Sequence, residues 1–439
     1  MTEDCRGISY TVKDAAAVEG FDHVIAGYLG MARDTGDRLK AVFDADPEMP
    51  MVNVLKGYFF LLMASTPLKE RALKVAGDID PILKDANARE RLHGQALKCW
   101  AAGDVAGALR AWEDILTEHP RDILAMRLAH HGHFYKGDSQ NVRDVVARRL
   151  HAWDEGVPGY GFVMGMRAFG LEETHGYRAA IDAGEKAVAI NPNDPWAIHA
   201  VAHVYEMIDQ PDDGIAWITG HEAGWTGAHN FRYHLYWHRA LMHLDAGDAD
   251  AVLASYDAEL WDPDSNEYLD LCNDASLLMR LELHGVDVGE RWQALAEKCE
   301  SRKGEHILAF VDAHYALALA AAGSPAADEV VSSMAAYAGA SGEDNAAVSA
   351  EVGVALADAM VAYKKGDFGR VVDMLHPVRY EVRTVGGSHA QRDLFAMMLI
   401  DAALKAGRLD TARALAAERL GRQPANLWSQ QMFEKAMAA

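Results

Sequence analysis

The chain has 439 residues, of which 50% are hydrophobic and 24% are charged, and its formal net charge is -23. This composition excludes a disordered chain, and the length exceeds that of one ordinary globular core. Several domains or an array of repeats remain. Because the acidic balance repels phosphate groups and anionic lipid surfaces, we expect no nucleic-acid and no membrane partner.

The N-terminal region lacks the basic and apolar segments of a signal peptide, and the apolar run Gly57–Ser65 is too short to span a bilayer. The four cysteines are far apart and form no CxxC pair. Neither a thiolate zinc site nor a disulfide framework is therefore predicted. These features favour a reducing compartment, and we expect the protein in the cytoplasm. We expect residues 1–87 to form an N-terminal helical cap.

The segment Arg89–Pro120 has the pattern of a helical hairpin, with small residues in both helices, a Gly-Asp turn at 103–104 and a terminal proline. The next Gly-Asp turn, at Gly137, follows Gly103 by 34 residues, which is the tetratricopeptide (TPR) period. Similar hairpins are predicted downstream, with turns at Gly247, Gly285, Gly323, Gly366 and Gly407. The sequence therefore predicts an all-α, TPR-like α-solenoid of antiparallel helical hairpins.

Repeats are expected at 88–334 and at 346–439, on either side of a linker at 335–345 that is rich in glycine, alanine and serine. In the first group, His199, His203 and Glu206 are spaced i, i+4 and i+7, which places them on one face of a helix. His234 and His238 repeat the i, i+4 spacing in the first helix of the following hairpin. Because first helices line the concave surface of a solenoid, we expect both sets to face one histidine-rich groove.

Polar residues recur in or beside the first helices of other hairpins, and these are further candidates for ligand binding together with His199 and His234. They are His130, His131, His133, His229, Trp237, Asp274, Asp312, His314, His389 and Arg392.

Four ordered blocks go beyond a generic repeat: LKGYFFLLM from Leu55, HAVAHVYEM from His199, HNFRYHLYWHRALMHL from His229 and GGSHAQRD from Gly386. Over nearly the whole chain they resemble the tetratricopeptide repeat protein 38 family. The resemblance implies a soluble TPR-like solenoid and does not imply a settled reaction.

Three interpretations of the histidines stay open. The first is structural, with each imidazole satisfied by neighbouring groups. In the second, imidazoles one helical turn apart bind an ion, with Glu206 as a carboxylate ligand. The zincin motif HExxH is absent because position 200 is alanine. No cofactor is favoured, although a divalent metal such as zinc at His199, His203, His234 and His238 is kept open. The third interpretation is a metal-free polar pocket.

The leading functional hypothesis is a protein that binds a small polar or cationic ligand, or a peptide, in this acidic groove. The alternative is a hydrolase or lyase in which His203, Glu206 and His238 perform acid–base chemistry, with or without a metal. A protein-interaction scaffold is a further alternative. The markers of nucleotide-binding loops and of serine hydrolases are absent from the sequence. Assembly into a homo-oligomer is left open.

Overall fold

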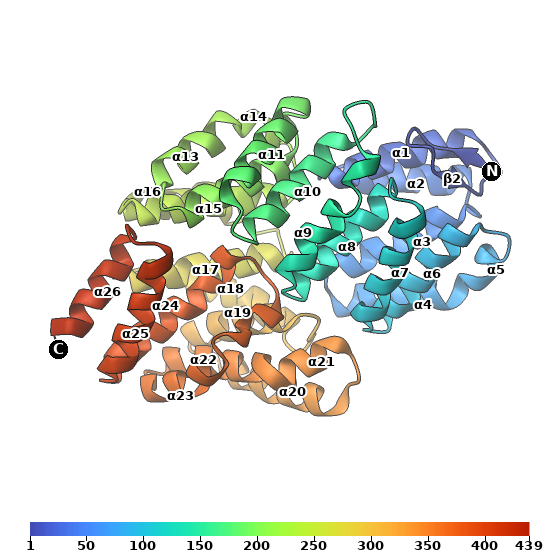
Figure 1. The fold of residues 1–439 in the computed structure, drawn as a ribbon. Helices are drawn as coiled ribbons and strands as arrows, with labels where there is room; N and C mark the ends of the chain where they lie inside the picture. The colour runs from blue at the N-terminus through green and yellow to red at the C-terminus, as the bar shows by residue number, and fades with distance from the viewer. Residues whose placement is uncertain (439) are drawn as a thin grey trace. The chain divides into compact units, whose positions relative to one another are not determined.

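The structure of the protein is a computed structural model that describes residues 1–438. The described chain is mainly helical with almost no sheet, and the predicted all-α, TPR-like solenoid is confirmed (Figure 1). One feature that the sequence pattern did not indicate is a small antiparallel sheet of β1 (Thr2–Glu3) and β2 (Ser9–Tyr10).

The chain divides into two compact units. The first unit comprises residues 1–201 and 221–232, and the second comprises residues 202–220 and 233–439. This division differs from the predicted parts, since both flanks of segment 335–345 lie inside the second unit. Residues 335–340 complete a helix, because four of these six residues are alanine, a strong helix former. The segment is therefore no linker between domains.

The first unit contains a series of helical hairpins that begins directly after the small sheet. Its helices are α1 (Ala16–Leu29), α2 (Thr35–Ala45), α3 (Pro50–Leu62), α4 (Thr66–Asp78), α5 (Asp80–Leu83), α6 (Ala88–Ala101), α7 (Val105–Glu118), α8 (Ile123–Tyr135), α9 (Ser139–Ala147), η1 (Leu150–Ala152), α10 (Tyr160–Glu172), α11 (Tyr177–Ile190) and α14 (Glu222–Trp225). Helices α12 (Pro195–Met207) and α15 (Phe231–Asp245) begin in the first unit and end in the second.

The Gly-Asp turns join the two helices of a hairpin by a repeated local geometry. Gly103 has φ +82°, a left-handed conformation that a side chain would disfavour. The carboxylate of Asp104 then accepts a hydrogen bond of 2.6 Å from the backbone N–H of Gly107 and caps α7. A left-handed glycine followed by an aspartate cap recurs at Gly137–Asp138, Gly247–Asp248 and Gly366–Asp367.

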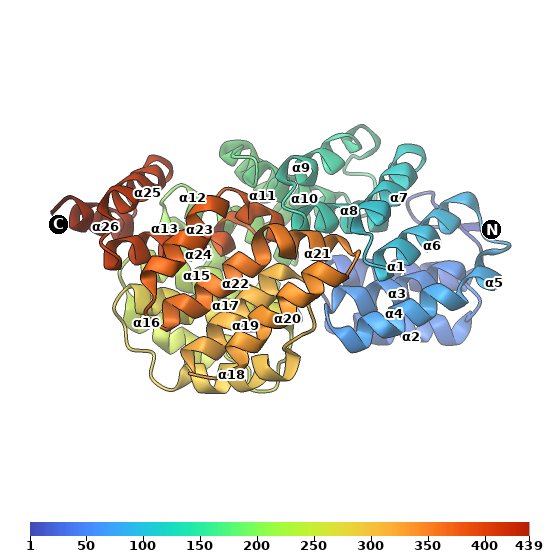
Figure 2. The same cartoon turned by 90° about the horizontal axis from the view of Figure 1, so that it is seen from below.

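The second unit continues with hairpins of the same kind. Its helices are α13 (Pro211–Gly220), α16 (Ala249–Ser255), η2 (Tyr256–Leu260), α17 (Tyr268–Leu283), α18 (Arg291–Arg302), α19 (Ala309–Ala321), α20 (Ala326–Ala340), α21 (Asp344–Val348), η3 (Ser349–Gly353), α22 (Val354–Lys364), α23 (Phe368–Val378), η4 (Glu381–Val385), α24 (His389–Lys405), α25 (Leu409–Arg422) and α26 (Leu427–Ala438). Figure 2 shows α19, α20 and α22 side by side.

One helical run is long and apolar enough to cross a membrane by length and composition alone. It covers Asp344–Lys364, and 61% of its apolar window is buried inside the protein. Helix α22, which ends this run, packs on α19, α20 and α23. These contacts are those of a core helix.

The C-terminal helices of the second unit return to its first ones, beside α17 (Figure 1). The side chain of Gln423 donates a hydrogen bond of 3.0 Å to the backbone carbonyl of Glu206 in α12. Trp428 Nε1 donates to the carbonyl of Leu283 at the end of α17, at 3.2 Å. Repeats of a simple solenoid contact only their neighbours, so this return adds contacts that the repeat period does not contain. It brings polar residues of α24–α26 to those of α12 and α15.

Candidate functional site

Three buried histidines of the second unit meet between α12 and α15, and we call them the imidazole cluster: His203, His234 and His238. The ring centre of His238 lies 4.3 Å from that of His203 and 4.6 Å from that of His234. The Nε2 atoms of His234 and His238 are 3.2 Å apart. These two helices therefore turn His203, His234 and His238 toward each other.

The other ring nitrogens of two of these histidines contact oxygen atoms. His238 Nδ1 lies 2.8 Å from a carboxylate oxygen of Glu206, and His234 Nδ1 lies 3.2 Å from Oδ1 of Asn273 in α17. Trp237 stacks on the His234 ring with centres 5.2 Å apart and an interplanar angle of 11°. The result is a continuous buried series of polar groups in the order Glu206, His238, His234, Asn273.

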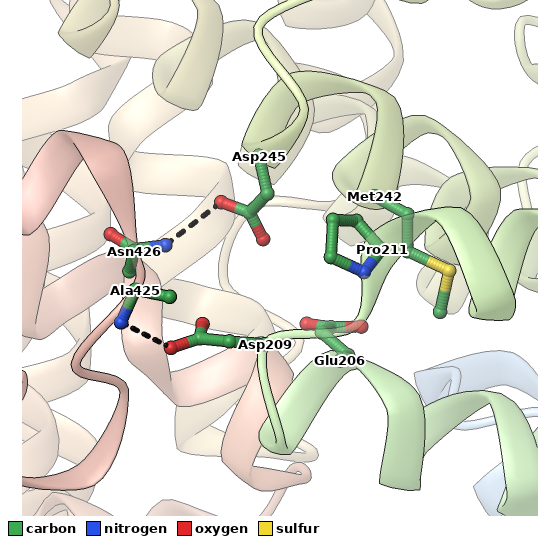
Figure 3. Close-up of a pocket in the computed structure, with 7 residues that line it drawn as sticks. All are labelled: Glu206, Asp209, Pro211, Met242, Asp245, Ala425 and Asn426. Carbon is green, nitrogen blue, oxygen red and sulfur yellow. Dashed lines mark hydrogen bonds between the residues drawn. The ribbon is translucent and has the colours of Figure 1, made fainter.

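The Glu206 carboxylate also lines a small cavity of about 30 Å³ (Figure 3). Asp209 and Asp245 turn their carboxylates into the same space. The remaining lining residues are Pro211, Met242, Ala425 and Asn426. Asp209 accepts a hydrogen bond from the backbone N–H of Ala425, and Asp245 accepts one from the side chain of Asn426, each at 3.0 Å. A space of this size holds about one or two water molecules or one small polar group.

Two guanidinium groups and a further carboxylate lie near this cavity. Arg419 pairs with both carboxylate oxygens of Asp393, at 3.0 and 2.6 Å. Arg280 donates to the backbone carbonyl of Ala390 at 2.6 Å and contacts Ser276. Its electrostatic neighbours are carboxylates of α12, α15 and α24. Four carboxylates, at 206, 209, 245 and 393, therefore face two guanidinium groups.

With few positive charges nearby, the buried carboxyl groups of this cavity have altered pKa values. Burial raises the pKa of Glu206 to about 8 and that of Asp245 to about 7, although neighbouring guanidinium groups act in the opposite direction. Burial would also raise the pKa of Asp393, but Arg419 holds it below its ordinary value.

The imidazoles shift the other way, because burial disfavours their charged form. Burial, with the Arg280 charge in addition, lowers the pKa of His238 to about 3. Burial also lowers the pKa values of His203 and His234 well below the ordinary value. The three rings are therefore neutral near pH 7. In the contact between Glu206 and His238, the proton is on the carboxyl group of Glu206.

Several of the predicted site residues belong to the first unit. His199 lies one turn before His203 on α12 and packs on the rings of Phe169 and Trp196, with centres 5.6 and 5.2 Å away. His130 Nδ1 lies 3.0 Å from the carbonyl of Val142.

The other predicted histidines of this unit have separate surroundings. Burial lowers the pKa of His131 well below its usual range, and the Arg127 charge adds to this. His133 lies 3.3 Å from Asp138. His229 precedes α15, and its backbone N–H donates to the carbonyl of Met31 at 2.9 Å.

Three other predicted residues contact different groups of the second unit. The electrostatic neighbours of Asp274 are Asp270, Lys298 and Asp262, whereas its sequence neighbour Asn273 contacts the imidazole cluster. Asp312 lies 3.3 Å from His306. His314 Nδ1 lies 2.8 Å from the carbonyl of Phe310.

His389 and Arg392, at the start of α24, contact each other at 3.3 Å. Both lie close enough to His203 to contribute to the lowering of its pKa. The polar site residues that the sequence did not select include Asp209, Asp245, Asn273 and Asn426. Two of them had a signal nearby, because Asn273 is adjacent to the selected Asp274 and Asp209 follows the selected Glu206 by three residues.

No protein-family model matches the chain. Among solved structures, the human IFIT1 dimer with m7Gppp-AAAA is similar at 13% identity and a TM-score of 0.43, over 98% of this chain and 95% of that chain. Yeast Tom70 is similar at 12% identity and a TM-score of 0.33, over 97% and 96%. The TPR domain of P58(IPK) is similar at 14% identity and a TM-score of 0.22, over 96% and 97%.

These likenesses concern the succession of helical hairpins. No ligand or partner follows from them, because every TM-score is well below that of a close structural match. The expectation that this chain binds no nucleic acid receives no support from them. That expectation rests on net charge alone.

Proposed function

We propose that the chain is a TPR-like binding protein whose second unit holds the ammonium group of a small ligand in the cavity lined by Glu206, Asp209 and Asp245. The observation that carries the proposal is the convergence of three carboxylates on one cavity of about 30 Å³. An ammonium group has three N–H donors and one positive charge. It therefore matches both the number of acceptors and the sign of the missing charge.

The size and the charge of the cavity limit the chemical class of the ligand. The small volume of the cavity favours a compact cationic head, so we expect a primary amine with the alkyl part outside. Binding a cation stabilises the ionised carboxyl groups of Glu206 and Asp245, whose protonation is favoured while no cation is bound. A free amine and the lysine side chain of a peptide offer the same chemistry at this site.

Calorimetric titration of the full chain with n-butylammonium, with chelator present, tests the proposal. We expect saturable one-to-one binding and at least a tenfold loss of affinity in Asp245→Asn. Asp250→Asn removes an exposed carboxylate of the adjacent helix α16 and should leave the affinity unchanged. A titration of the native chain without a saturable heat signal would contradict the proposal. Equal affinities of Asp245→Asn and Asp250→Asn for n-butylammonium would also contradict it.

Two further arms of the titration define the ligand. Butanol lacks the charge and should not bind. A short peptide with a central lysine should bind as n-butylammonium does if the natural ligand is a peptide. Weaker binding of the peptide than of the free amine indicates a small molecule.

An acid–base hydrolase or lyase is the second candidate, supported by the series Glu206, His238, His234 and Asn273. A carboxyl group with a pKa of about 8 on a cavity wall suits a general acid near neutral pH. Turnover of small esters and amides by the native chain, lost in His238→Gln and kept in His130→Gln, would favour this candidate over simple binding. We also propose membership of the tetratricopeptide repeat protein 38 family, on the four sequence blocks at Leu55, His199, His229 and Gly386.

The cytoplasm remains the proposed location, supported by four cysteines that are all free within the described residues.

A further inference from the structure

The two facing Nε2 atoms of His234 and His238 raise a question of hydrogen-bond direction. While Glu206 is protonated, its O–H group donates to His238 Nδ1, and the Nε2–H group of His238 can donate to His234. Once Glu206 is ionised, it accepts a hydrogen bond from the Nδ1–H group of His238, and Oδ1 of Asn273 accepts one from the Nδ1–H group of His234. A neutral imidazole carries only one N–H group, so both Nε2 atoms then present lone pairs. At 3.2 Å these lone pairs repel each other unless a positive centre lies between them.

The distance between these nitrogens matches a shared metal ion. Zinc binds imidazole nitrogens at about 2.0–2.1 Å in tetrahedral geometry, which places two nitrogens on one ion about 3.3 Å apart. The two Nε2 atoms are 3.2 Å apart. Very little movement of the two rings is needed to accommodate an ion beside them.

The partners of the two Nδ1 atoms are also those of metal-binding histidines. Such residues donate their second ring N–H to a carboxylate or carbonyl oxygen, which fixes the tautomer and orients the ring. Glu206 and Asn273 occupy these positions for His238 and His234. Stacking of Trp237 on His234 further limits rotation of that ring.

A third ligand comes from α12. His203, His234 and His238 can each present one ring nitrogen, with all of these atoms within 4.8 Å of one another. The three side chains are buried. His199 precedes His203 by one turn but belongs to the first unit, so the ligand set is taken from the histidines of the second unit alone.

We infer that His203, His234 and His238 bind one divalent transition-metal ion of the zinc class, with Glu206 and Asn273 orienting two of the three rings. Imidazole ligands suit zinc, copper, nickel and iron better than magnesium or calcium. Three protein ligands leave one tetrahedral position for water or another small ligand. Metal binding at the cluster does not require an amine in the cavity, because Asp209 and Asp245 take no part in it and Glu206 acts there only through its hydrogen bond with His238.

The test uses the untagged full chain, produced in zinc-supplemented medium and in a parallel cobalt-supplemented medium and purified without chelator. Elemental analysis should find about one zinc or cobalt ion per chain. His130→Gln is the matched control, because it removes a buried imidazole outside the cluster, and it should retain the metal. His234→Gln should reduce the metal content at least tenfold. A native chain without metal, or full metal content in His234→Gln, overturns the inference.

A second measurement on the native chain guards against loss of folding in the variant. X-ray absorption at the zinc edge counts the ligand atoms directly, and we expect three imidazole nitrogens at about 2.0–2.1 Å. The cobalt protein should show the intense visible absorption of tetrahedral coordination. A first shell containing sulfur, or oxygen atoms without imidazoles, assigns the metal to another place and overturns the inference even if His234→Gln fails to fold.

Discussion

Glu206→Gln should remove a specific pH dependence of stability. Burial raises the pKa of Glu206 from the ordinary 4.5 to about 8 in the folded chain. Between these values the folded state binds a proton that the unfolded state does not bind. The stability contributed by this proton is therefore complete below pH 4.5 and is lost as pH rises through 8.

The size of the effect follows from the same two pKa values. A group of this kind changes the free energy of unfolding by about 1.4 kcal/mol per pH unit inside its window. From pH 6 to pH 8 the loss for the native chain amounts to about 2 kcal/mol relative to Glu206→Gln, allowing for partial titration near pH 8. Asp245 also titrates in this range, and because the Glu206 charge raises its pKa, its contribution cancels only in part in the comparison.

Urea unfolding of the native chain and of Glu206→Gln, at several pH values from 6 to 8.5 and with chelator and no amine, measures this difference. Difference infrared spectroscopy should also show a carboxylic-acid C=O band that titrates in the native chain and is absent from the variant. Glu113→Gln serves as the control. Burial opposes ionisation of Glu113, yet its hydrogen bond to His133 and the nearby guanidinium groups lower its pKa to about 2. Its pH profile should run parallel to that of the native chain. A constant difference between native and Glu206→Gln over the whole range would show that Glu206 is ionised throughout and would refute the reasoning.

Three further predictions concern other contacts. Asn273→Leu removes the acceptor of the His234 Nδ1–H group and should weaken zinc binding by about 10- to 100-fold in competition with a chromophoric chelator. Gly224→Ala places a methyl group 2.1 Å from the backbone carbonyl oxygen of Pro192 and should lower stability by about 1–3 kcal/mol, measured by urea unfolding. Asp122→Ala leaves the buried guanidinium of Arg89 without its partner at 2.6 Å and should cost about 3–5 kcal/mol in the same assay.

Control substitutions show whether these losses are specific to the contacts named or follow from any substitution in the chain. A methyl group added at Gly220 would meet nothing within 4 Å, so Gly220→Ala should be close to neutral. Asp410 has a fully exposed side chain, and Asp410→Ala should change stability very little. Equal losses in Gly220→Ala and Gly224→Ala would contradict the steric argument. A small effect of Asp122→Ala would show that the neighbouring structure relaxes around Arg89.

The hairpins and the facing histidines could be predicted because each depends on a short-range rule. The left-handed glycine and the aspartate cap at Gly103–Asp104 are local, and they set the period of the array. The i, i+4 spacing fixes which face of a helix carries His234 and His238. Adjacency of successive first helices then brings that face to His203.

The acidic cavity could not be predicted, because it depends on the return of the C-terminal helices. Asn426 contacts Asp245 across 181 positions of the chain, and no repeat period relates them. The choice of Asp274 over Asn273 had a different cause. Residues next to each other on a helix point about 100° apart, and sequence alone did not fix the rotation of α17 about its axis. We selected Asp274 for its carboxylate, whereas the packing of α17 places the amide of Asn273 against the imidazole of His234.

Glu206 is the residue that the cavity and the imidazole cluster share, and it couples the two proposed sites. An ammonium group in the cavity needs the carboxylate ionised, and so does a metal at the cluster, since His238 must donate its Nδ1–H group. Whichever cation binds first removes the Glu206 proton. The second cation then binds without the free-energy cost of deprotonating Glu206. With a pKa of about 8, the cost at pH 7 corresponds to a factor of about ten in affinity, which is the upper limit of favourable coupling before repulsion between the cations. At pH 9 the proton is already absent, so only repulsion remains. The ratio of n-butylammonium affinities with and without zinc should therefore fall as pH rises from 7 to 9. A ratio that does not change with pH would show that the two sites do not act through the Glu206 proton.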